Sequence, residues 1–499
     1  MSNQSGIKSL AKDTAIYGVS SIVGKFFNWL LVPFYSRVIT QAEFGISQQL
    51  YAWIALIIVI LTYGMETGYF RFASDNSGKW NANKVYTTTL TSILCTSVVF
   101  VILFSMFNPQ IAFVMRLSDF TPLVMIMGVT VAIDAFSTIP FGYLRFTNKP
   151  VKFMIIKLLT IFSNIFFVLF FLWLCPKIYA KNPDLISWFF KPDNKVLYIV
   201  IANLLGSLSG LLALLPYIFV KKWEFDFSLL KKMLRYSLPL LLLGVVGIMN
   251  QTLDKLLFPY LFNGSQLAMR SELGVYQACF KIAMVMMMFS YAFKFAYEPF
   301  VFSQKNKGDN KMLYSLSMKF YVISSLIIFL VLTAYLDVLA LLLKESFRSA
   351  IMIIPFVLIT YLFQGIYFNL SIWYKLSDRT HWGTWISLIG FVLTLVSYRI
   401  FIPIYSYWAC VFGSLFSFFV MMSVSYLLGQ KYFPIKYNLK KIGAYFAFAI
   451  SLAALMLLVK MPNLWLTILW RSALLVPFLV LVIKKDVPVK EIIARIKKG

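Results

Sequence analysis

The stretch EFGISQ, residues 43–48, opens a long apolar segment, and it recurs 229 positions later as ELGVYQ, residues 272–277. Glutamate, glycine and glutamine are identical in the two copies. A second pair of stretches, RFTNK at 145–149 and KLSDR at 375–379, is separated by 230 positions and lies between hydrophobic segments in both cases. Two pairs at nearly one offset predict a duplicated helical bundle, an arrangement typical of membrane transporters.

The composition places the chain in a membrane. Of its 499 residues 60% are hydrophobic, and the mean hydropathy is +0.80. Stretches of about 20 apolar residues, the length that crosses a bilayer, recur along the chain and must be helical, because the hydrocarbon core offers no water to the backbone. We therefore predict an all-α integral membrane protein with about 14 transmembrane helices. The predicted segments are 14–37, 44–66, 85–107, 121–144, 151–174, 196–219, 236–261, 273–298, 314–336, 349–371, 382–402, 406–429, 441–460 and 463–483.

The repeat divides these segments into two halves. Residues 28–34 align with 254–260, and both halves begin on the same side, so we expect two six-helix repeats related by a parallel pseudo-two-fold axis. The last two segments have no counterpart. The predicted organisation is an N-terminal six-helix bundle at 1–220, a cytoplasmic linker at 221–235, a C-terminal six-helix bundle at 236–430, and two extra helices with a basic cytoplasmic tail at 431–499.

The charge distribution indicates topology. The chain has 46 Lys and Arg against 19 Asp and Glu, a formal net charge of +27. Most of the cations fall on the side that holds both termini, which is the cytoplasmic side under the positive-inside rule. Contact with anionic membrane lipids explains these basic runs, and no motif supports binding to nucleic acid. The four cysteines and the single histidine lack metal-ligand spacing, so we expect no metal site and no cofactor.

Charges inside the predicted helices are the candidate functional groups, because a charge at mid-bilayer is costly and usually faces a polar interior. Lys25, Lys255 and Lys281 are candidates for a cationic cavity that binds an anionic cargo such as a diphosphate. Pairing with an acid is the structural alternative for these lysines.

Three acids within or at the end of the predicted helices, Glu66, Asp134 and Asp254, are candidates for ion coupling or for ion pairs. Pro33 and Pro259 occupy matching late positions in the leading helix of each half, and proline kinks a helix, so both are candidate hinges. Proline without such a function is also common in membrane helices.

No catalytic motif is present. The sequence has no Gly-rich phosphate loop, no Walker motif and no Ser/His/Asp set, so we do not expect an enzyme. A membrane glycosyltransferase or polymerase would need a large loop with polar catalytic residues, and the longest loop, about residues 175–195, offers no convincing site. A purely structural scaffold would not require internal charges.

The chain resembles the Wzx-type polysaccharide flippases of the multidrug/oligosaccharidyl-lipid/polysaccharide exporter (MOP) superfamily over essentially its whole length. Fourteen helices, twelve in two repeats and two appended, are also the flippase pattern. The residues that carry the resemblance are Gly64, Thr67, Arg71 and Phe72 after the second segment, Glu43 with Gly45, Glu272 with Gly274, and Asp254, Lys255, Leu256 and Leu257 in the seventh.

The resemblance implies a function in O-antigen, capsule or exopolysaccharide biosynthesis. Such proteins flip undecaprenyl-diphosphate-linked oligosaccharide across the bacterial cytoplasmic (inner) membrane by alternating access. Polysaccharide polymerase and glycosyltransferases are the implied partners. A MurJ-like lipid II flippase and a cation-coupled multidrug exporter of the same superfamily are the alternatives.

Overall fold

The computed structural model describes residues 18, 22–75, 80–220, 222–304, 311–459 and 461–486. Every regular element in these ranges is helical, and thirteen spans are long and apolar enough to cross a membrane. They confirm the prediction of an all-α, multi-pass membrane protein. The predicted first segment lies partly outside the described residues, and within them residues 22–38 are helical, so the count of fourteen stays a prediction.

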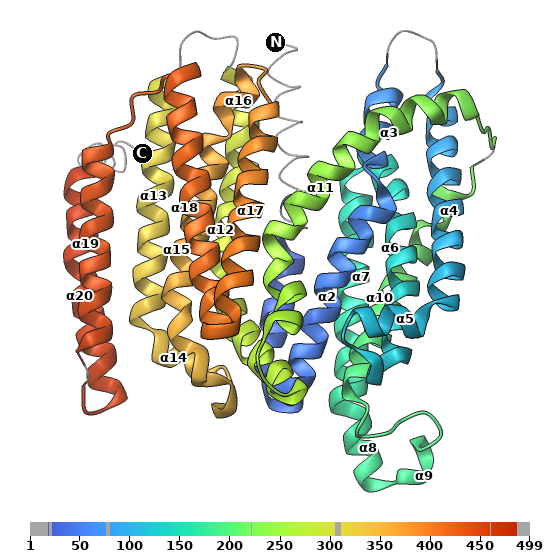
Figure 1. The fold of residues 1–499 in the computed structure, drawn as a ribbon, viewed down its shortest axis with the longest axis horizontal. Coiled ribbons are helices and arrows are strands. Elements are labelled where there is room, and N and C mark those ends of the chain that lie inside the picture. The colour runs from blue at the N-terminus through green and yellow to red at the C-terminus, as the bar shows by residue number, and fades with distance from the viewer. Residues whose placement is uncertain are drawn as a thin grey trace, which may run out of the picture. The chain divides into compact units, whose positions relative to one another are not determined.

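The chain folds into two compact units, which are described one at a time. Unit 1 comprises Met1–Gln277 and Phe391–Cys410. In it α10 packs against α6 and α7, α4 packs against α6, and α2 packs against both α6 and α11 (Figure 1). Besides residues 22–38, its helices are α2 (Gln41–Thr62), α3 (Met65–Ala73), α4 (Ala82–Met106), α5 (Asn108–Val114), η1 (Ser118–Phe120), α6 (Thr121–Phe146), α7 (Pro150–Leu169), η2 (Phe170–Leu174), α8 (Cys175–Lys181), α9 (Pro183–Ile186), α10 (Lys195–Ile218) and α11 (Phe227–Leu261).

Unit 2 comprises Ala278–Gly390 and Val411–Gly499. Its α13 packs against α15 and also against the appended pair α19 and α20 (Figure 1). Three long helices, α12 (Gln266–Gln304), α17 (His381–Tyr405) and α18 (Tyr407–Tyr432), contribute residues to both units. The other helices of unit 2 are α13 (Lys311–Ala334), α14 (Leu336–Leu341), η3 (Glu345–Ile353), α15 (Ile354–Leu370), α16 (Ile372–Leu376), α19 (Leu439–Leu458) and α20 (Leu464–Asp486).

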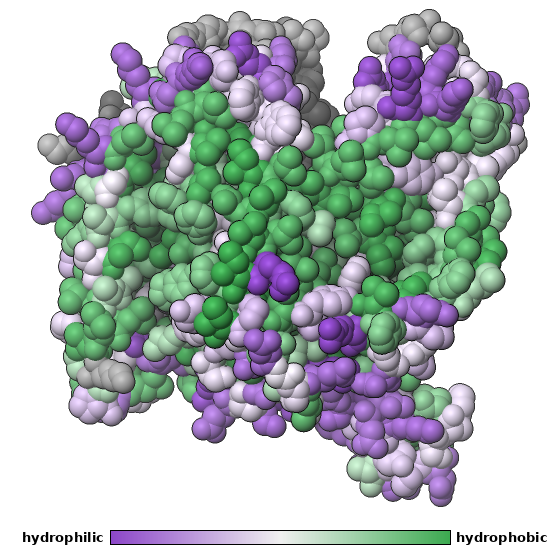
Figure 2. Space-filling model, viewed as in Figure 1, coloured by the Kyte–Doolittle hydropathy of each residue, from purple (hydrophilic) through white to green (hydrophobic). Residues whose placement is uncertain are grey.

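The surface of the helices fits a bilayer. In each unit hydrophobic residues cover the middle of the helices, and hydrophilic residues gather near their ends (Figure 2). Large side chains such as Ile102, Phe166 and Leu242 are more than half exposed, which is costly in water and neutral in hydrocarbon.

Helix α11 begins inside the predicted linker. It starts at Phe227, nine residues before the predicted segment, because Asp226 caps it by accepting a hydrogen bond from the Leu229 N–H. The same carboxylate pairs with Lys84 at 2.8 Å. The bond from Lys84, followed by the one from the Leu229 N–H, lowers the pKa of Asp226 below its usual value. The added turns bury Leu229 and Met233 in the core of unit 1, so this part of the linker belongs to the packed structure.

Candidate functional site

The two copies of the repeated stretch meet where α2 approaches α12 in unit 1. A Cβ atom on Gly45 would collide with the backbone carbonyl oxygen of Arg270, and one on Gly274 would collide with that of Gln41. Each glycine therefore faces the carbonyl group four residues before the other, which makes the contact reciprocal. Glycine permits two helices to approach this closely, and any other side chain would force them apart.

The glutamates of the two copies have different roles. Glu43 forms a capping box with Thr40 at the start of α2. Glu272 lies inside α12 and accepts a hydrogen bond from the Ser406 hydroxyl. The predicted segment 273–298 therefore begins too late. Helix α12 already starts at Gln266, where the Ser265 side chain accepts a hydrogen bond from the Ala268 N–H.

A buried polar cluster surrounds Asp254 on α11. The Lys255 Nζ lies 3.0 Å from both carboxylate oxygens of Asp254. The Tyr276 hydroxyl donates to Oδ2 at 2.9 Å, and the Gln277 amide donates to the same oxygen at 3.0 Å. The carboxylate is thus satisfied by three side chains, two of which belong to the second copy of the repeated stretch.

The cluster is close to neutral and well packed. The side chains of Asp254 and Lys255 are only 6% and 14% exposed. The ring of Tyr276 stacks on Tyr407, with 6.1 Å between the centroids. Lys255 is therefore paired with Asp254, as the structural alternative anticipated.

The other two candidate lysines lie on long helices. Lys25 is half-buried on the helix of residues 22–38 in unit 1, and Lys281 is half-buried on α12 in unit 2. The sequence neighbours of both lysines are mostly apolar, so each lysine is a charged residue within a membrane-spanning helix.

The remaining candidate acids both have partners in unit 1. Glu66 on α3 forms an ion pair with Arg145 on α6, whose guanidinium lies 5.0 Å from the centre of the Phe70 ring. Asp134 on α6 is hydrogen-bonded by the Ser207 hydroxyl and interacts electrostatically with Lys157.

Unit 2 contains a counterpart of the Glu66–Arg145 pair. The Lys375 Nζ on α16 lies 2.5 Å from the Glu298 Oε1 on α12. Lys375 follows Arg145 by 230 positions, and Glu298 follows Glu66 by 232. We call these two ion pairs, one in each unit, the corner pairs. The candidate site residues did not include Arg145, Glu298 or Lys375. The sequence nevertheless marks both cations, because each is the first residue of the second pair of repeated stretches, RFTNK and KLSDR.

The turns that follow the corner pairs also match. Asn148 and Asp378, again 230 positions apart, have positive φ angles of 51° and 55°. In both turns the residue before them, Thr147 or Ser377, bonds through its hydroxyl to the carbonyl four residues earlier, at 2.8 Å. The residue after Asn148 or Asp378 is a cation that lies over a tyrosine ring. Lys149 lies over Tyr217, and Arg379 lies over Tyr432. The second pair of repeated stretches, 145–149 and 375–379, therefore adopts the same local structure in both halves of the sequence.

The two candidate hinge prolines both lie within helices of unit 1. Pro33 lies within the helix of residues 22–38, and its carbonyl accepts from Ser36 and Arg37. Pro259 is buried near the end of α11. Their role in bending stays a prediction.

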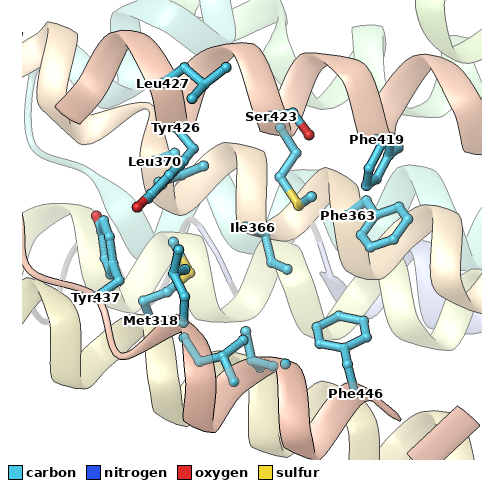
Figure 3. A pocket seen from close by; sticks show the side chains of 15 residues that line it. Met318, Phe363, Ile366, Leu370, Phe419, Ser423, Tyr426, Leu427, Tyr437 and Phe446 are labelled. Atoms are coloured by element: carbon cyan, nitrogen blue, oxygen red, sulfur yellow. The ribbon is translucent and has the colours of Figure 1, made fainter. Parts of the chain in front are cut away.

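Unit 2 contains an apolar cavity of about 550 Å³ between α13, α15, α18 and α19. Figure 3 shows Met318 and Ile366 in its middle, the tyrosines Tyr426 and Tyr437 at one end, and the rings of Phe363 and Phe446 at the other. Its lining has no charged side chain, so sequence reasoning based on charge could not find it. Within the described ranges, no three His, Cys, Asp or Glu side chains gather to hold a metal ion.

The described residues form an all-helical, multi-pass membrane protein with charged side chains inside its helices. A family model described as polysaccharide biosynthesis protein matches residues 10–301, more than half of the chain, so the chain belongs to this family. A second family model, described as MatE, matches residues 265–400. Comparison with curated protein sequences gives no match.

Solved structures of MOP-superfamily proteins share this fold. A structure of the lipid II flippase MurJ in an inward closed conformation has a TM-score of 0.69 and 14% identity, covering 93% of this chain and 98% of that one. An inward-facing multidrug resistance MATE family transporter has a TM-score of 0.63 and 14% identity, covering 87% and 98%. A MOP superfamily transporter from Pyrococcus furiosus has a TM-score of 0.57 and 14% identity, covering 85% and 94%. The likeness confirms the predicted superfamily fold.

Proposed function

We propose that this protein flips undecaprenyl-diphosphate-linked oligosaccharide from the cytoplasmic to the periplasmic leaflet of the bacterial inner membrane, for surface polysaccharide biosynthesis. The observation that carries the proposal is the family match over residues 10–301, whose description is polysaccharide biosynthesis protein. The likeness in fold to a structure named a lipid II flippase supports a lipid-linked cargo. The chain itself performs no covalent chemistry in this function.

The diphosphate is the anionic part of this cargo, and Lys25 and Lys281 are its proposed partners. A charge inside a membrane helix costs about 2.5–3.5 kcal/mol on insertion scales, and such residues usually face a polar interior and mark substrate pathways. Lys255 has a smaller proposed role, because Asp254 holds its ammonium group at 3.0 Å. The lipid tail stays in the bilayer during transport.

Movement between inward- and outward-open states is the proposed mechanism, with Pro33 and Pro259 as bending points. Asp254, Asp134 and Glu66 are the proposed groups for ion coupling. Asp254 and Glu66 each have a protein cation beside them, Lys255 and Arg145, so a coupling ion would have to compete with these groups.

Both termini are proposed to lie in the cytoplasm, where the basic segments contact anionic lipid. Glycosyltransferases and a polysaccharide polymerase would supply and consume the cargo on the two sides of the membrane. Lipid II transport is the second candidate function, favoured by the likeness to MurJ, and drug export is the third, favoured by the MatE match over residues 265–400.

Flipping by the purified protein in proteoliposomes tests the proposal. Vesicles that contain undecaprenyl-diphosphate oligosaccharide should expose it to an impermeant glycosidase or lectin only when the protein is present. Replacing the cargo with lipid II, or with a cationic dye, separates the three candidates. Transport of lipid II or of the dye, but not of the oligosaccharide lipid, would reject the proposal.

The cargo residues are tested with single neutral variants. Lys25→Gln and Lys281→Gln should each reduce flipping about tenfold or more, since an intramembrane contact to a charged group is worth ~1.5–3 kcal/mol. Lys152→Gln, an exposed lysine on α7, is the matched control and should transport normally. Full activity in both test variants would remove these lysines from the site.

A further inference from the structure

The cavity in unit 2 is a slot along the inner side of α19. At one end Phe446 of α19 meets Phe363 of α15, with 6.0 Å between the ring centroids. At the other end Tyr437, just before α19, meets Tyr426 of α18 at 6.1 Å. The cavity lies between these two aromatic contacts, and Figure 3 shows the open space between the two pairs of rings.

Gly443 marks the middle of the slot. It lines the cavity, and a Cβ atom built on it would find nothing within 4 Å. Leucines at the rim are largely exposed, Leu427 by 66% and Leu439 by 51%. In a membrane these rim residues face the lipid, so hydrocarbon has direct access to the slot.

Ionic contacts hold the appended pair α19 and α20 on α13. The Asp486 carboxylate at the end of α20 is 2.9 Å from Lys319 of α13 and 2.7 Å from Lys441 of α19, and it accepts from the Tyr445 hydroxyl. The Asp486 side chain is 1% exposed. This clamp fixes α19 against α13 and leaves the gap toward α15 and α18 unfilled by protein.

We propose that one hydrocarbon chain of a bilayer phospholipid occupies this slot as a resident structural lipid. The slot has an apolar lining and opens to the hydrocarbon of the bilayer, so lipid chains rather than water fill its volume of about 550 Å³. Aromatic contacts form the two ends of the slot, and its apolar lining suits one flexible hydrocarbon chain.

Bulk phospholipid is the occupant, and the polyprenyl chain of the proposed cargo is not. The lining has no charged side chain, and a hydrocarbon chain offers no polar atom to the hydroxyls of Ser423 and the two tyrosines, so the slot does not distinguish one hydrocarbon chain from another. A site without selectivity fills with the most concentrated ligand, which in a membrane is phospholipid. The lipid therefore serves the attachment of α19, independently of the proposed transport function.

Gly443→Trp tests the inference by blocking the middle of the slot. The matched control is Ala444→Trp, which places the same ring at an exposed position of α19 that does not line the cavity. After purification in mild detergent, native mass spectrometry should find one retained phospholipid on the wild-type protein and on Ala444→Trp. The Gly443→Trp protein should carry about tenfold less, by mass action at a blocked site. If Gly443→Trp does not fold, Ser423→Leu on the opposite wall replaces it.

Two results would overturn the inference. One is equal lipid retention by the blocked and control variants, or none by the wild type. The other is a folded Gly443→Trp that loses oligosaccharide-lipid flipping while Ala444→Trp keeps it, which would assign the slot to the cargo chain. A wild-type protein that retains phospholipid but flips no oligosaccharide lipid would reject the proposed function and leave this inference intact.

Discussion

Asp254 lies in a membrane-spanning helix and receives hydrogen bonds from Lys255, Tyr276 and Gln277. A buried ion pair contributes little beyond its own desolvation cost while it is complete, but loss of one partner leaves an uncompensated charge. The cluster also joins α11 to the second copy of the repeated stretch. Its integrity therefore matters for packing as well as for any role in coupling.

Asp254→Ala should destabilise the protein by about 3–5 kcal/mol, because Lys255 is left buried without its partner. Asp254→Ala with Lys255→Met should recover about 0.5–3 kcal/mol of this loss, since the unpaired charge is gone. Thermal unfolding of the detergent-solubilised variants measures both effects. A double variant no more stable than Asp254→Ala would show that the two side chains are not coupled.

At the scale of elements, the approach of α2 to α12 depends on backbone contact. Both helices present glycine where the other presents a carbonyl oxygen, and the contact leaves no room for a methyl group. Replacing either glycine with a larger residue would force the two helix backbones apart, because the added Cβ atom meets backbone and not a movable side chain. Close backbone approach of this kind is the usual basis of helix association in membranes, where burial of apolar surface provides no driving force.

Gly45→Ala and Gly274→Ala should each cost about 1–3 kcal/mol by overpacking. Gly247→Ala on α11 is the matched control, since a Cβ atom there meets nothing within 4 Å. It should be neutral or stabilise by about 0.5–1 kcal/mol, because alanine favours helix over glycine. The melting temperatures of the three variants measure these differences in stability. Equal melting temperatures would mean that α2 and α12 can move apart without loss of stability.

At the scale of the whole molecule, the corner pairs show where the two halves of the sequence agree. Glu66–Arg145 and Glu298–Lys375 each tie one early helix of a half to the end of a later one, and the same turn follows. Their positions in the chain are consistent with the predicted duplication. The candidate cargo residues do not repeat in this way, since Gln251 stands where the alignment places Lys25.

Exchange of the charges tests the corner pairs. Neutral substitution of one partner should cost only about 0.2–1 kcal/mol, because the side chains in unit 1 are about one third exposed. Arg145→Glu should do more damage by placing two acids together, and adding Glu66→Arg should restore stability. In unit 2, Lys375→Glu alone should likewise destabilise the protein, and adding Glu298→Lys should restore its stability. Failure of both exchanges to rescue unfolding would mean that the pairs do not hold their units together.

The membrane class, nearly all of the spans and the glycines of the repeated stretch could be predicted because they are local properties. The length of an apolar run and the ban on open backbone in hydrocarbon decide a helix without reference to its neighbours. The start of α11 at Phe227 was missed because Lys231, Lys232 and Arg235 interrupt the apolar pattern, while the helix depends on a cap from Asp226.

The sequence by itself determined that this chain is a multi-pass helical membrane protein of the polysaccharide biosynthesis family, since hydropathy and motif order are written along the chain. Only the tertiary structure decided that Gly45 faces Gly274, that Lys255 is neutralised by Asp254, and that an apolar slot lies beside α19. These facts depend on which helices become neighbours. Packing brings together residues that are hundreds of positions apart, and no local pattern in the chain specifies those contacts.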